Sequence, residues 1–216
     1  MLHLLESTPS IVNRYVSELR DVEVQKDRLR FRRNMERIGE CIGFEISKTL
    51  DFQAHTVTTP LGESTTQIPG DEVVLATILR AGLPLHQGLL NVFDKAGNAF
   101  VSAYRRHHKD GTFEIAVEYL SCPSLDNKVL IISDPMLATG SSMVLATQAL
   151  LRNGLPKSIH FVSAIAAQQG LDHLQRHFGQ GHVWLGALDE ELTAKSYIVP
   201  GLGDAGDLSY GAKLQE

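Results

Sequence analysis

The segment from Val129 to Leu151 joins an apolar strand to an apolar helix through a short loop of small and hydroxyl-bearing residues. Residues Val129–Ser133 form a continuous apolar run typical of a buried strand, and a helix is predicted from about Ser142. The loop between them carries Asp134 and then Thr139-Gly140-Ser141. A helix that begins after such residues presents unpaired backbone N–H groups and the positive end of its dipole, which together bind phosphate. Asp134, just before the loop, is placed to accept hydrogen bonds from sugar hydroxyls.

From residue 73 onward, apolar strands alternate with helices along the chain. Continuous apolar strands that alternate with helices predict an α/β fold whose largely parallel sheet is covered on both faces. In such sheets, ligands bind beyond the carboxyl ends of the strands. The predicted strands are Val73–Leu79, Phe100–Arg105, Glu114–Leu120, Val129–Ser133, Ser158–Ala164 and Val183–Leu188, and the predicted helices are Leu85–Phe93, Met143–Arg152 and Leu171–Phe178.

The opening third of the chain is predicted to be helical and to end in a β-hairpin. Apolar residues recur every three or four positions over Asp27–Leu50, as one buried helix face requires. Two Thr-rich stretches, Thr56–Thr59 and Ser64–Ile68, then flank the turn Pro60-Leu61-Gly62. Because no repeat or Pro/Gly/Ser-rich linker divides the chain, residues 1–216 are interpreted as one domain.

Composition excludes several classes of protein. The chain has no apolar run near the ~20 residues of a membrane span, and its N-terminus lacks the pattern of a secretion signal. Its two cysteines, Cys41 and Cys122, have no metal-ligand spacing, which predicts a cytoplasmic protein without a disulfide framework. The net charge of −5 disfavours nonspecific binding of nucleic acid.

Two predicted strands end in arginine. Arg80 precedes Ala81-Gly82, where it could hold a pyrophosphate through paired charge-assisted hydrogen bonds while the glycine lets the backbone approach. Arg105 opens a basic run of residues 105–109. Taken alone, each is more simply explained as a surface charge or a solvated loop. Together they could neutralise a leaving pyrophosphate.

The segment Tyr197–Asp207 is rich in glycine and contains Pro200 and two aspartates, which predicts a fixed loop with outward-facing backbone groups. A pyrimidine edge offers an acceptor, a donor and a second acceptor. Backbone amides and carbonyls in a rigid loop can match that pattern without any side chain.

These segments, in this order and spacing, resemble the uracil phosphoribosyltransferases of the type I phosphoribosyltransferase superfamily. The resemblance rests mainly on Asp134-Pro-Met-Leu-Ala-Thr-Gly140 and Tyr197-Ile-Val-Pro-Gly-Leu-Gly-Asp-Ala-Gly206, and it covers essentially the whole chain. It implies transfer of the 5-phosphoribosyl group of phosphoribosyl pyrophosphate (PRPP) to uracil N1, giving UMP and pyrophosphate, with Mg2+ bound to PRPP.

The resemblance also implies a role for individual residues. Arg80, Arg105 and Asp204 are expected to act in catalysis, Asp204 facing PRPP through its Mg2+, and uracil is expected at Ile198, Gly203, Asp204 and Ala205. The residues expected to bind PRPP are Arg80, Arg105, Asp134, Pro135, Met136, Leu137, Ala138, Thr139, Gly140, Ser141, Ser142 and Asp204.

The chain departs from the family pattern at two places. Ser141 replaces a glycine, which is tolerated if its φ is negative, and Leu208-Ser209 stands where a basic residue is usual. The effect of either departure on activity is left open, as are the order of substrate binding and activation by GTP, which is known for some members. A homodimer or homotetramer is expected, and residues Arg106–Thr112 could close over the site as a lid.

A competing interpretation is a regulatory relative that keeps the fold but binds RNA, or senses PRPP without catalysis. Its support is a basic cluster in the helix predicted from residue 27, where the sequence more simply explains the arginines as a solvated face or a subunit contact. The cluster consists of Arg28, Arg30, Arg32, Arg33 and Arg37.

Overall fold

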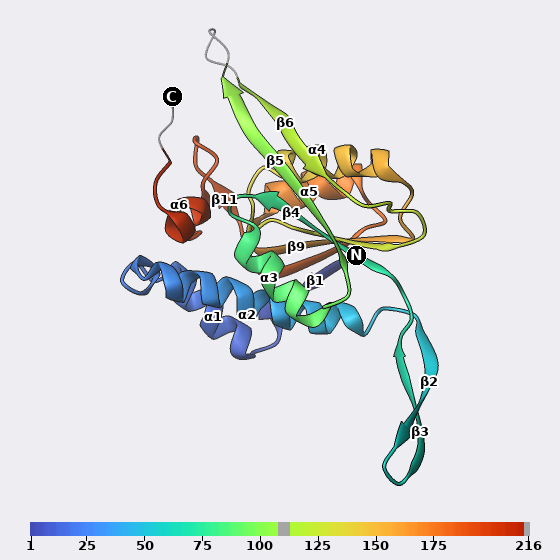
Figure 1. The fold of residues 1–216 in the computed structure, drawn as a ribbon. Coiled ribbons are helices and arrows are strands. Elements are labelled where there is room, and N and C mark those ends of the chain that lie inside the picture. The colour runs from blue at the N-terminus through green and yellow to red at the C-terminus, as the bar shows by residue number, and fades with distance from the viewer. Residues whose placement is uncertain (108–112, 214–216) are drawn as a thin grey trace.

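The computed structural model describes the backbone of residues 1–107 and 113–213 and the side chains of residues 1–102 and 118–213. At its centre lies an eight-stranded sheet in the order β1-β10-β9-β7-β4-β5-β6, with β8 paired to β9 (Figure 1). Neighbouring strands run parallel except β5 and β6. The strands are β1 (Leu2–Leu4), β4 (Val73–Leu79), β5 (Gly97–His107), β6 (Phe113–Ser121), β7 (Val129–Ser133), β8 (Met136–Leu137), β9 (Ser158–Ala167) and β10 (His182–Asp189).

Helices cover both faces of this sheet. Alternate side chains of one strand point to opposite faces, so Val73 and Leu75 of β4 pack in one apolar cluster while Val74 and Ala76 pack in another. The first cluster is completed by α1 (Ile11–Arg20), α2 (Arg28–Ser47) and α3 (Leu83–Val92), and the second by α4 (Ser141–Leu150) and α5 (Gln168–His177). The predicted doubly covered, largely parallel α/β fold is therefore confirmed.

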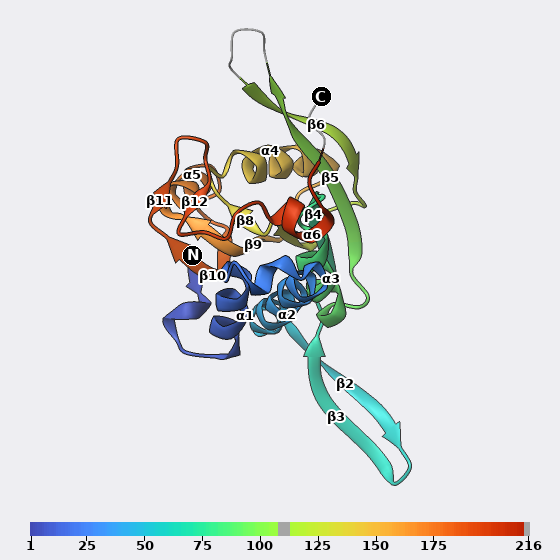
Figure 2. The same ribbon diagram turned by 90° about the vertical axis from the view of Figure 1, so that its left-hand side faces the viewer.

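The β-hairpin extension is confirmed and is longer than the sequence predicted. Strands β2 (Phe52–Thr59) and β3 (Gly62–Pro69) pair with each other and project from the body of the molecule beyond the end of α2 (Figure 1). Figure 2 shows from the side that the hairpin projects from one end of the molecule, while β5 and β6 extend toward the opposite end. Its strands are almost wholly exposed.

The order in which the chain adds strands to the sheet reverses between β4 and β7. From β4 the chain continues through α3 to β5 on one side, and from β7 it continues through α4 to β9 on the other. The two strands are in register, with Thr77 opposite Ser133 and the Thr77 hydroxyl donating to the Ser133 carbonyl over 3.3 Å. Their carboxyl ends thus lie side by side, at the position where ligands bind in open α/β sheets.

Several short elements were not predicted. The N-terminus is not helical at first: β1 pairs with β10, followed by the 3-10 turn η1 (Leu5–Ser7). A three-residue strand has too little local pattern to reveal a partner at the far end of the chain. The remaining elements are η2 (Val24–Lys26), η3 (Leu151–Asn153), β11 (Glu191–Leu192), β12 (Ile198–Val199) and α6 (Ala205–Tyr210). Among the described helices, none combines the length and apolar character that crossing a membrane requires.

Candidate active site

The loop of residues 134–142 lies between β7 and α4, as predicted. Gly140 precedes the helix with a φ of +79°, and Ser141 is the first residue of α4. Ser141 has no positive φ, so the condition for a serine at this position is met. The Thr139 hydroxyl donates to Ser141 Oγ over 3.2 Å and accepts a long hydrogen bond from Ser141 N at 3.4 Å. The Gly140 position provides no side-chain cap, so the first turn of α4 can offer backbone N–H groups to a ligand.

Residues Pro135 to Ala138 fix this loop against β9 and α5. The Pro135 carbonyl accepts hydrogen bonds from Ala164 N and Ile165 N, each at 3.1 Å, and Leu137 is buried in the core. A Cβ on Gly170 of α5 would lie 2.3 Å from the Ala138 carbonyl oxygen, so only glycine permits the close approach. Leu137 can therefore offer a ligand only its backbone groups.

Asp134 is half-buried at the end of β7. Desolvation by the surrounding protein raises its pKa from 3.8 to about 7, although a hydrogen bond from the Met136 backbone N–H opposes the shift. A carboxylate with so few hydrogen-bond donors around it is suited to accept hydrogen bonds from hydroxyl groups of a ligand, which would stabilise its charged form.

Arg80 follows β4 at the adjacent strand end, in the loop that leads through Gly82 into α3. A Cβ on Gly82 would lie 2.1 Å from Thr77 Oγ1, so the loop folds tightly over the end of the strand. Arg80 Nη2 donates to Asp207 Oδ1 over 2.9 Å and to the Gly211 carbonyl over 2.8 Å. Both hydrogen bonds use the same nitrogen, and within the described residues Nε and Nη1 make no hydrogen bond, so they can donate to an anionic ligand.

The segment 197–207 is partly a loop and partly secondary structure. Strand β12 pairs with β11, and Asp204 caps α6 by accepting a hydrogen bond from Asp207 N at 3.0 Å. Ile198 and Ala205 are each 3% exposed, so their side chains belong to the core and only their backbone can meet a ligand. Gly203, with a φ of +98°, is exposed.

Three predicted parts of the site come together. The ideal Cβ of Gly206 lies 3.8 Å from both Ala81 Cβ and Arg80 Nε, so α6 begins directly beside the Arg80 loop. Both views show α6 beside the end of β4 and the start of α3 (Figures 1 and 2). Because β4 is the neighbour of β7, the 134–142 loop lies next along the same edge.

Arg105 lies in β5 at a position for which the structure describes the backbone only. The proposed lid, Arg106–Thr112, falls for its greater part on residues 108–112, outside the described residues. The contribution of Arg105 to the site therefore remains a prediction from sequence.

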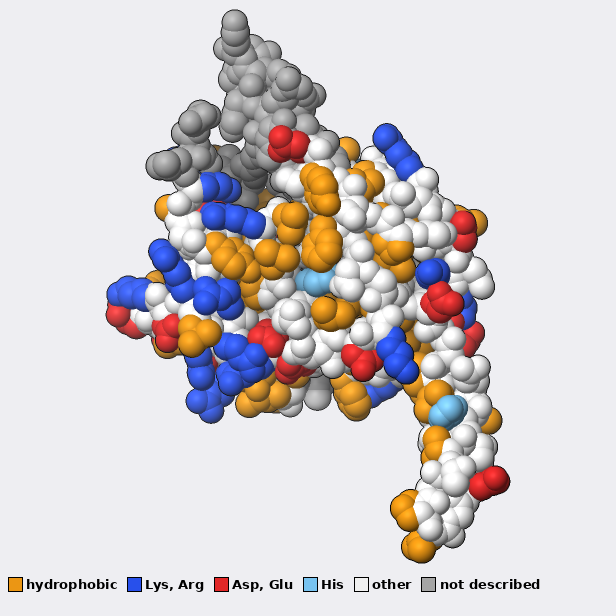
Figure 3. Space-filling view, viewed as in Figure 1, with side chains coloured by type: hydrophobic (Ala, Val, Ile, Leu, Met, Phe, Trp, Pro, Cys, Tyr) orange, Lys and Arg blue, Asp and Glu red, His pale blue; other side chains and the backbone are white. Residues whose placement is uncertain are grey.

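The arginines of the basic cluster make contacts within the chain. Arg30 forms a bidentate pair with Glu18 at 2.8 and 2.9 Å, and Arg33 pairs with Glu36. Arg32 Nη1 donates to the Ser209 carbonyl over 2.7 Å, which ties α2 to α6. Figure 3 shows basic side chains gathered where α1 and α2 meet, interleaved with acidic ones. Two of the five arginines are thus neutralised by carboxylates within the chain, so this surface is not a uniform basic patch.

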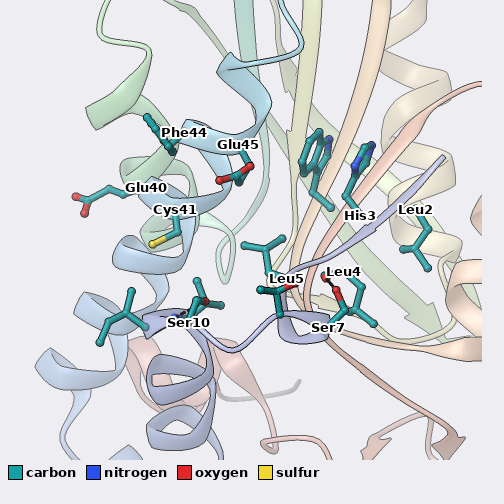
Figure 4. Close-up of a pocket in the computed structure, with 14 residues that line it drawn as sticks. Leu2, His3, Leu4, Leu5, Ser7, Ser10, Glu40, Cys41, Phe44 and Glu45 are labelled. Carbon is teal, nitrogen blue, oxygen red and sulfur yellow. Dashed lines mark hydrogen bonds between the residues drawn. The ribbon is translucent and has the colours of Figure 1, made fainter.

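A cavity of about 840 Å³ lies away from these segments, between β1, the start of α1 and the C-terminal half of α2 (Figure 4). Glu40, Cys41, Phe44 and Glu45 of α2 face it from one side, and leucines of the N-terminal segment face it from the other. The described residues that line it include no lysine or arginine, which makes it unsuited to a phosphorylated ligand.

Sequence reasoning did not assign a role to Asp207, Arg20 or Asp189. Asp207 binds Arg80, and Arg20 with Asp189 holds the backbone of Gly201. A charged residue carries no local mark of a partner more than a hundred positions away, so these pairings need the structure. The only indication in the sequence was that the 197–207 segment contains a second aspartate, Asp207, besides Asp204.

We predict that Asp134→Asn changes how stability depends on pH. The folded-state pKa of Asp134 lies above its unfolded value, so the native state binds this proton more tightly and the wild type loses stability as pH rises from about 4 to 7. The variant lacks this loss. Thermal unfolding at a series of pH values should show the wild-type midpoint falling relative to that of the variant across this window, and parallel curves would contradict the assignment.

Comparison with known proteins places these features in one family. The family model for uracil phosphoribosyltransferase matches residues 7–212. The uracil phosphoribosyltransferase of Porphyromonas gingivalis is 58% identical over 95% of each chain, and that of Thermococcus gammatolerans is 35% identical over 99% of this chain and 95% of its own. The solved structure of the AQ2163 protein from Aquifex aeolicus, 30% identical, aligns over 100% of both chains with a TM-score of 0.88. The chain belongs to the uracil phosphoribosyltransferase family.

Proposed function

We propose that this chain transfers the 5-phosphoribosyl group of PRPP to N1 of uracil, giving UMP and pyrophosphate in pyrimidine salvage. The observation that carries the proposal is the family match over residues 7–212, joined to the meeting of the 134–142 loop, Arg80 and the 197–207 segment at one edge of the sheet. We treat residues 1–216 as one phosphoribosyltransferase domain, because both apolar clusters pack on the same sheet.

The 5-phosphate of PRPP is assigned to the start of α4. Backbone N–H groups of residues 139–142 would donate to its oxygens, and the helix dipole favours its charge. Asp134 would accept hydrogen bonds from the ribose hydroxyls. Since these bonds favour the carboxylate over the acid, PRPP binding would lower the raised pKa of Asp134.

The pyrophosphate is assigned to Arg80 and Arg105. Asp207 and the Gly211 carbonyl hold Nη2 of the Arg80 guanidinium, and its Nε and Nη1 would donate to the pyrophosphate. Mg2+ would arrive with PRPP and neutralise phosphate charge, since Mg2+ in such sites is held by one or two carboxylates and the substrate phosphates. Asp204 fits that role, because one of its oxygens caps α6 and the other makes no hydrogen bond to the described residues.

Uracil is assigned to the segment around Ile198, Gly203, Asp204 and Ala205. Because the side chains of Ile198 and Ala205 are buried, recognition would come from backbone groups: an N–H opposite O4 and a carbonyl opposite N3–H. Such a pocket positions the ring without a charged side chain. Hydrogen bonds to the uracil carbonyls also stabilise the anion that forms at N1, so a dedicated base is unnecessary.

The reaction breaks the bond between C1′ and the pyrophosphate oxygen and forms the bond from C1′ to uracil N1, with inversion at C1′. The bonding electron pair leaves with pyrophosphate, so positive charge develops on the ribose and negative charge on the leaving group. Arg80, oriented by Asp207, and Arg105 would stabilise that leaving charge, and the N1 proton is lost to solvent. The chain acts by electrostatic preorganisation rather than through a nucleophilic side chain.

The regulatory alternative has less support. An RNA-binding surface needs arginines that are available to phosphates, whereas Arg30, Arg32 and Arg33 contact groups within the chain. A PRPP sensor would also bind the pyrophosphate through Arg80, so this residue does not separate a sensor from the enzyme. The family match favours the enzyme.

Other properties follow from the family resemblance alone. We infer a cytoplasmic enzyme that assembles as a homodimer or homotetramer, with uracil and PRPP as its small-molecule substrates. GTP is the effector to test first, since it activates some members of the family.

We predict that purified protein with Mg2+ converts uracil and PRPP to UMP and rejects cytosine. Cytosine presents an amino donor where uracil presents O4, and an acceptor where uracil presents N3–H. Two mismatched polar groups should lower kcat/KM by roughly 10³-fold or more. UMP and CMP formation measured with a panel of nucleobases tests this. Comparable turnover of cytosine would contradict recognition by backbone groups.

We predict that Arg80→Ala lowers kcat by about 10²-fold or more, because it removes a cation from the developing pyrophosphate charge. Arg152→Ala is the matched control, since Arg152 is exposed and lies in η3, beyond the end of α4 opposite to the helix start assigned to the phosphate. Initial rates and thermal unfolding would be measured for both variants. Near-normal turnover in Arg80→Ala would refute the assigned role.

A further inference from the structure

The end of α1 and the end of β10, which are distant in sequence, meet at the backbone of Gly201. Arg20, the last residue of α1, and Asp189, the last residue of β10, form a bidentate ion pair with both N–O distances at 2.8 Å. Arg20 Nη1 also donates to the Gly201 carbonyl over 3.0 Å, and Asp189 Oδ2 accepts from Gly201 N over 3.1 Å. The ion pair and one peptide residue thus form a closed ring of hydrogen bonds.

This ring leaves Gly201 little freedom. Its backbone N–H and carbonyl are both bonded to the ion pair, so any rotation of the residue breaks a charge-assisted hydrogen bond. Its φ is +59°, and a Cβ would lie 2.0 Å from the Ile198 carbonyl oxygen, so glycine is required on two independent grounds. The ring therefore fixes the course of the chain two residues before Gly203.

The ion pair is largely removed from water. The side chain of Asp189 is 7% exposed and that of Arg20 is 22% exposed. A buried ion pair is weak evidence for stability, because desolvation of the two charges offsets much of their attraction. Its geometric effect is better defined, since the arginine fork and the carboxylate meet in one orientation. This pairing suits a role in holding a loop in place.

We propose that Arg20 and Asp189 are positioning residues for recognition of uracil. The proposal rests on the assignment of uracil to the segment around residues 198–205. When backbone N–H and carbonyl groups bind a base, the strength of binding depends on the position of that backbone. A misplacement of about 1 Å can lower the rate of reaction about 10²-fold. The ion pair ties the segment to β10 at the same edge of the sheet that carries the 134–142 loop.

A second bidentate pair offers a matched control. Arg30 and Glu18 also join α1 to another element, with N–O distances of 2.8 and 2.9 Å, but they contact no residue of the 197–207 segment within the described part of the chain. If ion pairs of α1 act only on overall stability, loss of either pair should have similar consequences. If Arg20 and Asp189 position the base, only their loss should affect uracil selectively.

The experiment measures KM for uracil and for PRPP, with thermal unfolding, in Arg20→Ala, Asp189→Asn, the double variant, Arg20→Lys and Arg30→Ala. We expect KM for uracil to rise about tenfold or more in each of the first three, while KM for PRPP changes less than about threefold. The double variant should resemble the single ones, because the two residues act as a unit. The KM for uracil of Arg20→Lys should lie between those of the wild type and Arg20→Ala, since the lysine ammonium keeps the positive charge but cannot form the two parallel hydrogen bonds of a guanidinium. A KM does not depend on the folded fraction, so partial misfolding leaves the comparison valid.

Two outcomes would overturn the proposal. Equal rises in both KM values, or a rise for uracil in Arg30→Ala as large as in Arg20→Ala, would show a structural role only. Gly203→Ala separates this failure from that of the base site, because its φ of +98° strains any other residue within the proposed uracil segment. If Gly203→Ala raises KM for uracil and the ion-pair variants do not, the positioning role alone is wrong. If none of these variants alters KM for uracil, uracil binds elsewhere. Both the positioning role of Arg20 and Asp189 and the assignment of uracil to residues 198–205 are then wrong.

Discussion

The parallel pairing of β4 and β7 is the constraint on which the rest of the site depends. The two strands end at the same edge of the sheet, and the residues that follow them, Arg80 and Asp134, begin the two loops that face the expected substrate. The register between Thr77 and Ser133 sets their relative position, so neither loop can shift along the sheet without breaking the ladder. A cation for the leaving group and a helix start for the phosphate are thereby placed without any flexible connection between them.

Much of this site consists of backbone, and glycines make that possible. Gly82 packs against the Thr77 hydroxyl, and Gly170 packs against the Ala138 carbonyl, at distances that admit no side chain. Backbone N–H groups at a helix start cannot swing away from a ligand as a long side chain can, so little order is lost when the ligand binds. The cost is that each loop needs support from outside the site. Arg32 supports α6, Asp207 supports Arg80, and the ion pair at Gly201 supports the base segment.

The sequence was sufficient where the signal was local. The apolar runs of β4 and β7 and the Thr139-Gly140-Ser141 loop each show their structure within a few residues, so the sheet, the helix start and the family could be predicted. Ion pairs between residues that are distant in sequence could not be predicted. Arg20 and Asp189 are 169 positions apart and Arg80 and Asp207 are 127 apart, and nothing near any of them marks its partner. The sequence likewise did not indicate that the side chain of Ile198 is buried, because the core that covers it comes from other elements.

The most direct test of the central claim is a crystal structure of the protein with UMP bound. If the adjacent strand ends and the start of α4 form the substrate site, phosphate oxygens of UMP will accept hydrogen bonds from backbone N–H groups of residues 139–142. Its uracil ring will then lie against residues 198–205, with O4 facing an N–H. UMP bound instead in the cavity between β1 and α2, or with its phosphate toward the 197–207 segment, would contradict the claim.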